Sequence, residues 1–171
     1  MLSLNSFKKY EDLAKELGAV NAKIINASEV VVDNRSRLKC RFGCPGYFVI
    51  WTCPPRHGIQ PWTFKKRFLS QYSFALLIHV HDKETAQRIS LEIERRAFLD
   101  GYSLVFSLSD CALCEVCTCP EEPCRHPEKA RPAAQSLGID VFTTAKKQGF
   151  SIHTLENKDE EQNWYSIVLL D

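Results

Sequence analysis

The chain has 171 residues, eight of them cysteine, and a formal net charge of +1. A chain of this length can bury enough apolar surface to fold without disulfides, so we predict a single domain over residues 1–171. Charged residues make up 25% and hydrophobic residues 44%, a balance that excludes disorder and gives no basic surface for nucleic acid.

The N-terminal segment carries no export signal. Residues 1–9 lack the apolar stretch and small-residue cleavage site of a secretory signal, and no apolar run approaches the length of a bilayer span. We therefore expect a cytoplasmic protein that binds neither membrane nor nucleic acid. In a reducing compartment, cysteines serve more often as metal ligands or catalytic groups than as disulfides.

The first third of the chain predicts one helix, two short strands and a loop. Apolar residues recur at helical spacing between Ser6, a suitable N-cap, and Gly18, which would end the helix. Apolar runs at 22–25 and 30–32 predict two short strands. The glycine- and proline-rich segment 39–55 predicts an irregular loop.

The middle of the chain predicts a strand–helix–strand unit after a short helical stretch at 64–68. The apolar run 74–80 indicates a buried strand, and Asp82 is suited to cap a helix that runs to about Leu99. Alternating apolar residues at 102–108 then predict a half-buried strand.

The last third predicts two helices and two strands. Proline fits the first turn of a helix over 127–137, and Asp140 suits the cap of a second helix that ends at Gly149. Apolar runs at 150–153 and 164–170 predict strands. The fold class we predict is α+β: one domain, a mixed or antiparallel sheet of about four strands, flanking helices and two cysteine-rich loops at the sheet margin.

The second cysteine-rich segment, residues 111–124, has the spacing of an iron–sulfur ligand set. Three cysteines follow one another as C-x2-C-x2-C, the spacing with which a loop wraps three corners of a 4Fe-4S cubane. We take Cys124 as the fourth ligand, although six residues precede it where bacterial ferredoxins have three. The predicted set is Cys111, Cys114, Cys117 and Cys124.

The first cysteine-rich segment supplies a further group. Cys40, Cys44 and Cys53 lie within 14 residues, and proline follows the last two. Proline after a ligand fixes φ and keeps the loop from forming a helix. Such a group is unusual for a core, so we predict that these three cysteines are metal ligands.

The eighth thiol, Cys119, leaves three partitions open. In the first, Cys119 joins the cysteines of the first segment and the protein holds two complete 4Fe-4S clusters. In the second, Cys119 is not a ligand, and the three-cysteine cluster keeps an open iron that acts as a Lewis acid. In the third, Cys53 completes a single cluster with the C-x2-C-x2-C cysteines. Zinc is the competing metal, but a four-cysteine zinc site normally uses two C-x2-C pairs, and the first segment has none.

These residues carry a resemblance to a known family. The Cys40–Pro55 segment, residues 94–102 and residues 111–141 together resemble the domain of unknown function 2284 family, over nearly the whole chain. Its members are described as predicted metal-binding proteins, found largely in anaerobic bacteria and archaea. The resemblance implies seven cysteine ligands, Cys40, Cys44, Cys53, Cys111, Cys114, Cys117 and Cys124. Cys119 has no sure counterpart, so the eighth ligand stays open.

Three functions fit these patterns. The first is a redox accessory protein that binds one or two 4Fe-4S clusters and passes electrons to a larger redox enzyme; the sequence indicates no substrate pocket, which favours it. The second is an enzyme that binds a small-molecule substrate at the open iron of a three-cysteine cluster, for sulfur transfer or a Lewis-acid step. The third is a colourless interaction module held together by zinc.

Overall fold

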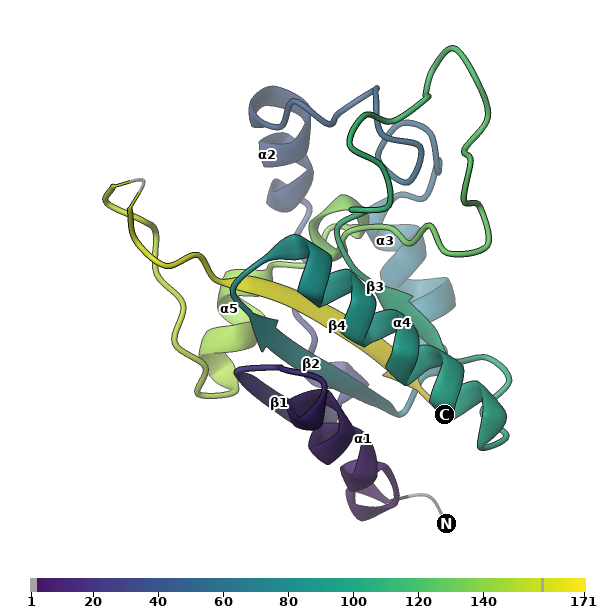
Figure 1. Ribbon diagram of the computed structural model, residues 1–171, viewed down its shortest axis with the longest axis vertical. Coiled ribbons are helices and arrows are strands. Elements are labelled where there is room, and N and C mark those ends of the chain that lie inside the picture. Colours follow the sequence, from purple (N-terminus) through teal and green to yellow (C-terminus); the bar gives the residue numbers. More distant parts are fainter. Residues whose placement is uncertain (1–2, 158) are drawn as a thin grey trace.

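The architecture is a four-stranded sheet with helical layers on both faces (Figure 1), seen in a computed structural model that describes residues 3–157 and 159–171. The strand order is β1-β2-β4-β3, and every neighbouring pair is antiparallel. The strands are β1 (Asn21–Asn26), β2 (Phe74–Val80), β3 (Phe106–Leu108) and β4 (Trp164–Leu170). The predicted α+β fold with about four strands is confirmed, and the sheet is antiparallel rather than mixed.

The two central strands are the apolar runs of the sequence. All residues of β2 are buried, and all of β4 but Trp164. The strands pair along their full length, from Phe74 opposite Leu170 to Val80 opposite Trp164. A strand covered on both faces needs apolar residues at consecutive positions, which explains why these two runs do not alternate.

One face of the sheet is covered by α1 (Leu4–Glu16) and α4 (Lys83–Leu99). The predicted helix after Asp82 is confirmed, and the Asp82 side chain accepts a hydrogen bond from the Thr85 N–H at 2.7 Å. Helix α1 begins earlier than predicted, because Ser3 rather than Ser6 is its N-cap. These helices bury their apolar stripes against alternate residues of the strands.

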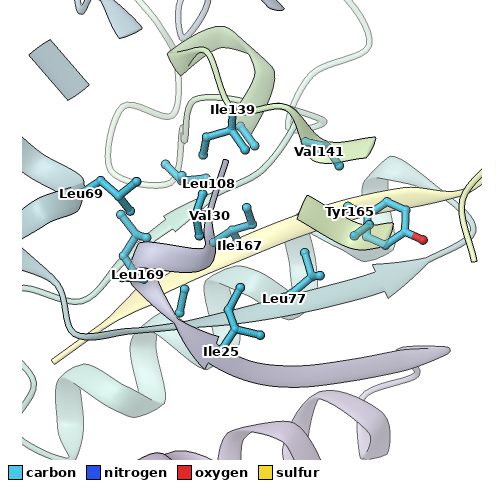
Figure 2. Close-up of a cluster of buried hydrophobic side chains, with 14 of the residues drawn as sticks. Ile25, Val30, Leu69, Leu77, Leu108, Ile139, Val141, Tyr165, Ile167 and Leu169 are labelled. Carbon is cyan, nitrogen blue, oxygen red and sulfur yellow. The ribbon is translucent and has the colours of Figure 1, made fainter. Parts of the chain in front are cut away.

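The other face is covered by short helical segments. These are η1 (Ala27–Glu29), α3 (Pro61–Thr63), the π-helical turn η2 (Phe64–Phe68), η3 (Leu69–Gln71), η4 (Ala134–Leu137) and α5 (Val141–Lys147). Figure 2 shows how Leu69, Ile139 and Val141 of this layer meet Leu77 and Ile167 of the sheet. The predicted helices at 64–68 and after Asp140 are thus present, the second capped by the Asp140 side chain.

Three predicted elements are wrong or shorter than expected. The helix predicted at 127–137 is only the turn η4, because Pro132 removes a donor and its ring blocks a helix in mid-course. The strand predicted at 150–153 is irregular, although Phe150 and Ile152 are buried and Tyr165 donates to the Ser151 carbonyl at 2.6 Å. The strand predicted at 102–108 is reduced to β3.

Two predictions in the first third also need correction. The strand predicted at 30–32 is a single bridge between Val32 and Ile139. The loop predicted at 39–55 begins inside α2 (Arg35–Gly43), so Cys40 lies on a helix. The short strand predicted at 22–25 is confirmed as β1.

Within the described residues, each helix falls short of the length or the apolar character that crossing a bilayer requires.

Candidate metal centre

Both cysteine-rich segments lie at the same end of the molecule, where α2 and the following loop meet the long irregular segment after β3 (Figure 1). All eight cysteines are free thiols. They fall into two groups, each lining its own cleft, with Cys119 outside both.

The first cleft, which we call the four-cysteine cleft, has a volume of about 280 Å³. It is lined by the four cysteines that the C-x2-C-x2-C spacing and Cys124 predict as one ligand set: Cys111, Cys114, Cys117 and Cys124. Residues 49–52 of the first cysteine-rich segment form part of its wall, and the cationic residues Lys83 and Arg125 line it as well. The structure therefore brings the four predicted side chains of the second segment together.

Polar contacts with the body of the protein hold this loop. The Ala112 N–H donates to Gln87 Oε1 on α4 at 2.8 Å, and the Ser109 N–H donates to the Pro132 carbonyl at 2.9 Å. Within the loop, Arg125 donates to the Val116 carbonyl at 2.9 Å. These hydrogen bonds tie the irregular segment to α4 and to Pro132 and satisfy some of its backbone groups.

One buried polar atom at the wall of the four-cysteine cleft lacks a partner within the described residues. Thr52, 5% exposed, lines the cleft with an Oγ1 that makes no hydrogen bond. Burial raises the pKa of Cys111, and the neighbouring Gln87 amide, itself 3% exposed, acts in the opposite direction. An unpartnered buried hydroxyl beside four soft thiols suits a bound group that offers acceptor sulfur atoms.

The second cleft, which we call the three-cysteine cleft, is much larger, about 1050 Å³. Cys40, Cys44 and Cys53 line it together with the Asp110 carboxylate. Apolar side chains line it too, among them Val141, Phe142, Leu155 and Trp164. The structure thus brings the three predicted cysteines of the first segment together and adds a carboxylate that the sequence analysis missed.

Helix α2 holds this group against the layer that contains η4. Arg37 donates to the carbonyl oxygens of Ile59 at 3.1 Å and Ser136 at 2.7 Å. The Cys40 thiol approaches the Gln135 carbonyl at 3.7 Å. α2 has no buried residue of its own, so these polar contacts fix its position.

The thiols of the three-cysteine cleft are electrostatically coupled. The pKa of Cys53 is raised to about 12, mainly by burial and then by the nearby Cys44 and Asp110. Burial, and then Cys44, also raise the pKa of Cys40. Cys111 contributes to the shift of Cys53, so the two cysteine groups adjoin each other. A bound cation would reverse these shifts, because it favours the thiolate form.

Cys119 is the one cysteine that belongs to neither group. It is 7% exposed and lines neither cleft. Burial raises the pKa of its thiol, followed by the nearby Cys117, and Cys124 is a further neighbour. Such burial is typical of a cysteine that serves as a small apolar side chain.

Across residues 3–157 and 159–171, no three His, Cys, Asp or Glu side chains converge closely enough to hold one metal ion. The two groups are instead spread around the walls of their clefts. A mononuclear zinc site needs thiolates about 2.3 Å from a single ion, whereas the ligands of a cubane bind four separate irons.

The family model described as "Predicted metal-binding protein (DUF2284)" matches residues 23–170. Nothing among the curated proteins or the solved structures matches the chain. The matched range includes all eight cysteines and every strand except the first two residues of β1.

Proposed function

Since the chain belongs to this family of predicted metal-binding proteins, we propose that its cysteines hold two iron–sulfur clusters and that the protein acts in electron transfer. One cluster would be bound by Cys111, Cys114, Cys117 and Cys124. The other would be bound by Cys40, Cys44 and Cys53, with Cys119 outside both. Bound clusters would supply one-electron redox chemistry.

The observation that carries the proposal is the four-cysteine cleft. A C-x2-C-x2-C motif and one distant cysteine line a single cavity of about 280 Å³. A water molecule occupies about 30 Å³, so the cavity has room for a group of several atoms. Lys83 and Arg125 at its wall would offset the negative charge of a thiolate-bound cluster.

The neighbourhood of the two groups supports electron transfer. Asp110 and Cys111 are consecutive in the chain, and one lines each cleft. Cys53 of one group is close enough to Cys111 of the other to feel its charge. Electrons would pass between the two groups across this border and leave at the exposed rim, where Val116 is 72% exposed.

Anaerobic purification with iron, zinc and acid-labile sulfide analysis tests the proposal. We expect a brown protein with about eight irons and eight sulfides per chain, reducible by dithionite. Cys114→Ser should remove about four irons, and Cys119→Ser, the matched control in the same loop, should remove none. A colourless protein that contains zinc and no sulfide would refute the iron–sulfur assignment.

A second function, an enzyme with an open iron in the three-cysteine cluster, is favoured by one observation. The sequence indicates no substrate pocket, but the three cysteines line a cleft of about 1050 Å³. Small-molecule sites typically measure about 300–1000 Å³. The enzyme hypothesis expects the spectrum of one cluster to change when a small molecule binds, whereas a pure electron carrier should show no such response.

A further inference from the structure

We propose that Asp110 is the fourth protein ligand of the three-cysteine centre, an oxygen ligand that a small molecule in the cleft displaces. The inference rests on the proposed function, because it needs a metal centre at Cys40, Cys44 and Cys53. It differs from the partition in which Cys119 completes this ligand set.

The first argument is location. Asp110 lines the same cleft as the three cysteines, two residues beyond the end of β3. Hydrogen bonds fix the chain on both sides of Asp110. The Ser109 N–H donates to the Pro132 carbonyl at 2.9 Å, and the Ala112 N–H donates to Gln87 Oε1 at 2.8 Å. A side chain between two such anchors is held in place, as a ligand must be.

The second argument is the lack of any other partner. Among the described residues, the Asp110 carboxylate forms no ion pair and no hydrogen bond with another residue, although Lys83 is near enough for its charge to act on it. The carboxylate lines the same cleft as the Cys40 and Cys53 thiols. A partly buried carboxylate without a direct partner is costly unless a cation joins it.

The third argument is the chemistry of the donor. A carboxylate oxygen is a harder ligand than a thiolate and suits iron less well than sulfur does in such a centre. Asp110 would therefore exchange more readily than the three cysteines. In the exchange, the bond to the Asp110 oxygen would break while a bond to a donor atom of the incoming molecule would form. A thiol would bind as the thiolate and its proton would pass to the released Asp110 carboxylate, and no electron would be transferred.

The cleft wall indicates what kind of molecule would enter. Ile139, Val141, Phe142, Leu155 and Trp164 give it a largely apolar lining. The ligand we infer is a small organic thiol with an apolar body, whose sulfur binds where Asp110 leaves.

Titration with benzyl mercaptan tests the assignment on anaerobically prepared wild type, Asp110→Asn, Asp110→Cys and Asp33→Asn. Asp33 is the matched control, because its carboxylate lines the same cleft but is paired with Arg35. We follow visible absorption and electron paramagnetic resonance together with iron and sulfide content. Wild type and Asp33→Asn should respond at the same concentration of benzyl mercaptan. Asp110→Asn should respond at a concentration about 10-fold lower, and Asp110→Cys only at a concentration about 100-fold higher.

The outcomes separate the two proposals. Wild type without iron and sulfide overturns the proposed function, and the Asp110 assignment fails with it. Two clusters in wild type, with Asp110→Asn and Asp110→Cys both titrating like Asp33→Asn, overturn the Asp110 assignment alone. If Asp110→Cys does not load iron, the response of the near-isosteric Asp110→Asn decides, with circular dichroism to verify its fold.

Discussion

The salt bridge between Glu94 and Arg131 anchors the chain to α4 seven residues after the second cysteine-rich segment ends. Arg131 Nε lies 3.0 Å from Glu94 Oε2 and its Nη2 2.5 Å from Oε1, while the side chains are only 15% and 13% exposed. The same carboxylate accepts hydrogen bonds from the N–H and Oγ of Ser107 on β3 at 2.7 and 2.5 Å. We predict that Glu94→Gln destabilises the protein, because it weakens the contacts that join α4, β3 and the segment around Arg131.

The burial of the pair sets the size of the effect. Removing one partner of a buried salt bridge leaves an uncompensated charge and costs about 3–5 kcal/mol. With a urea dependence of about 2 kcal/mol per M for a protein of this size, the midpoint of unfolding should fall by roughly 1.5–2.5 M. The assay is anaerobic urea unfolding of the metal-free, reduced protein, followed by circular dichroism.

The same helix provides the control. Glu92 pairs with Arg95 at 2.7 Å, but these side chains are 32% and 58% exposed. An exposed pair contributes about 0–1 kcal/mol, so Glu92→Gln should leave the midpoint nearly unchanged. Replacing both Glu94 and Arg131 by Met should cost less than the sum of the single changes, because no charge is left buried alone. Equal midpoints for Glu94→Gln and Glu92→Gln would refute the reasoning.

Three further predictions concern a turn, a thiol and the metal. Gly138→Ala should cost about 2–4 kcal/mol in thermal unfolding, because φ is +87° there and the added Cβ would lie 2.6 Å from Pro61 Cγ. A pKa of about 12 means that Cys53 of the metal-free protein loses its proton only well above pH 8. It should therefore hold about a thousandfold less thiolate at pH 8 than in the urea-unfolded chain and react with iodoacetamide far more slowly, as mass spectrometry of timed samples can show. Metal removal by a chelator should leave the far-ultraviolet circular dichroism unchanged, since neither apolar cluster of the described residues includes a cysteine; a loss of strand signal would contradict this.

The elements that could be predicted from sequence are those whose pattern is set by the core. β2, β4 and α4 are long, and each buries its apolar residues against the same sheet. The predicted elements that failed have two kinds of cause: Pro132 interrupts the helix predicted at 127–137 from within, whereas the segment at 150–153 depends on partners far along the chain. Phe150 and Ile152 look like a strand because they are apolar, yet they pack beneath the sheet without pairing, a position that local periodicity does not reveal.

The candidate metal site shows the same difference between local and long-range signals. The C-x2-C-x2-C motif identifies its cysteines as candidate ligands because their spacing lies within one short loop. No sequence motif identifies Asp110 or Gln87 as part of the site. Asp110 is a single carboxylate before a cysteine, and Gln87 is a polar residue on a helix. Only the packing of α4 against the segment after β3 brings Gln87 to Ala112. The large cleft likewise depends on Trp164 and Leu155, which lie more than a hundred residues from Cys40.

The way these loops are attached bears on how a metal would bind. Ordering a residue costs about 1–2 kcal/mol of backbone entropy, which in a zinc finger must come from the metal because the apo chain is unfolded. Here hydrogen bonds to the folded body offset part of that entropy cost. They join Glu94 to Arg131, Gln87 to Ala112, and Arg37 to the Ser136 carbonyl. Each of these contacts starts on α4 or joins α2 to η4, so the body of the protein contributes to ordering the loops. The free energy of metal binding is then available to select the metal and tune its reactivity, which suits a centre that exchanges electrons or ligands better than one that only holds a fold together.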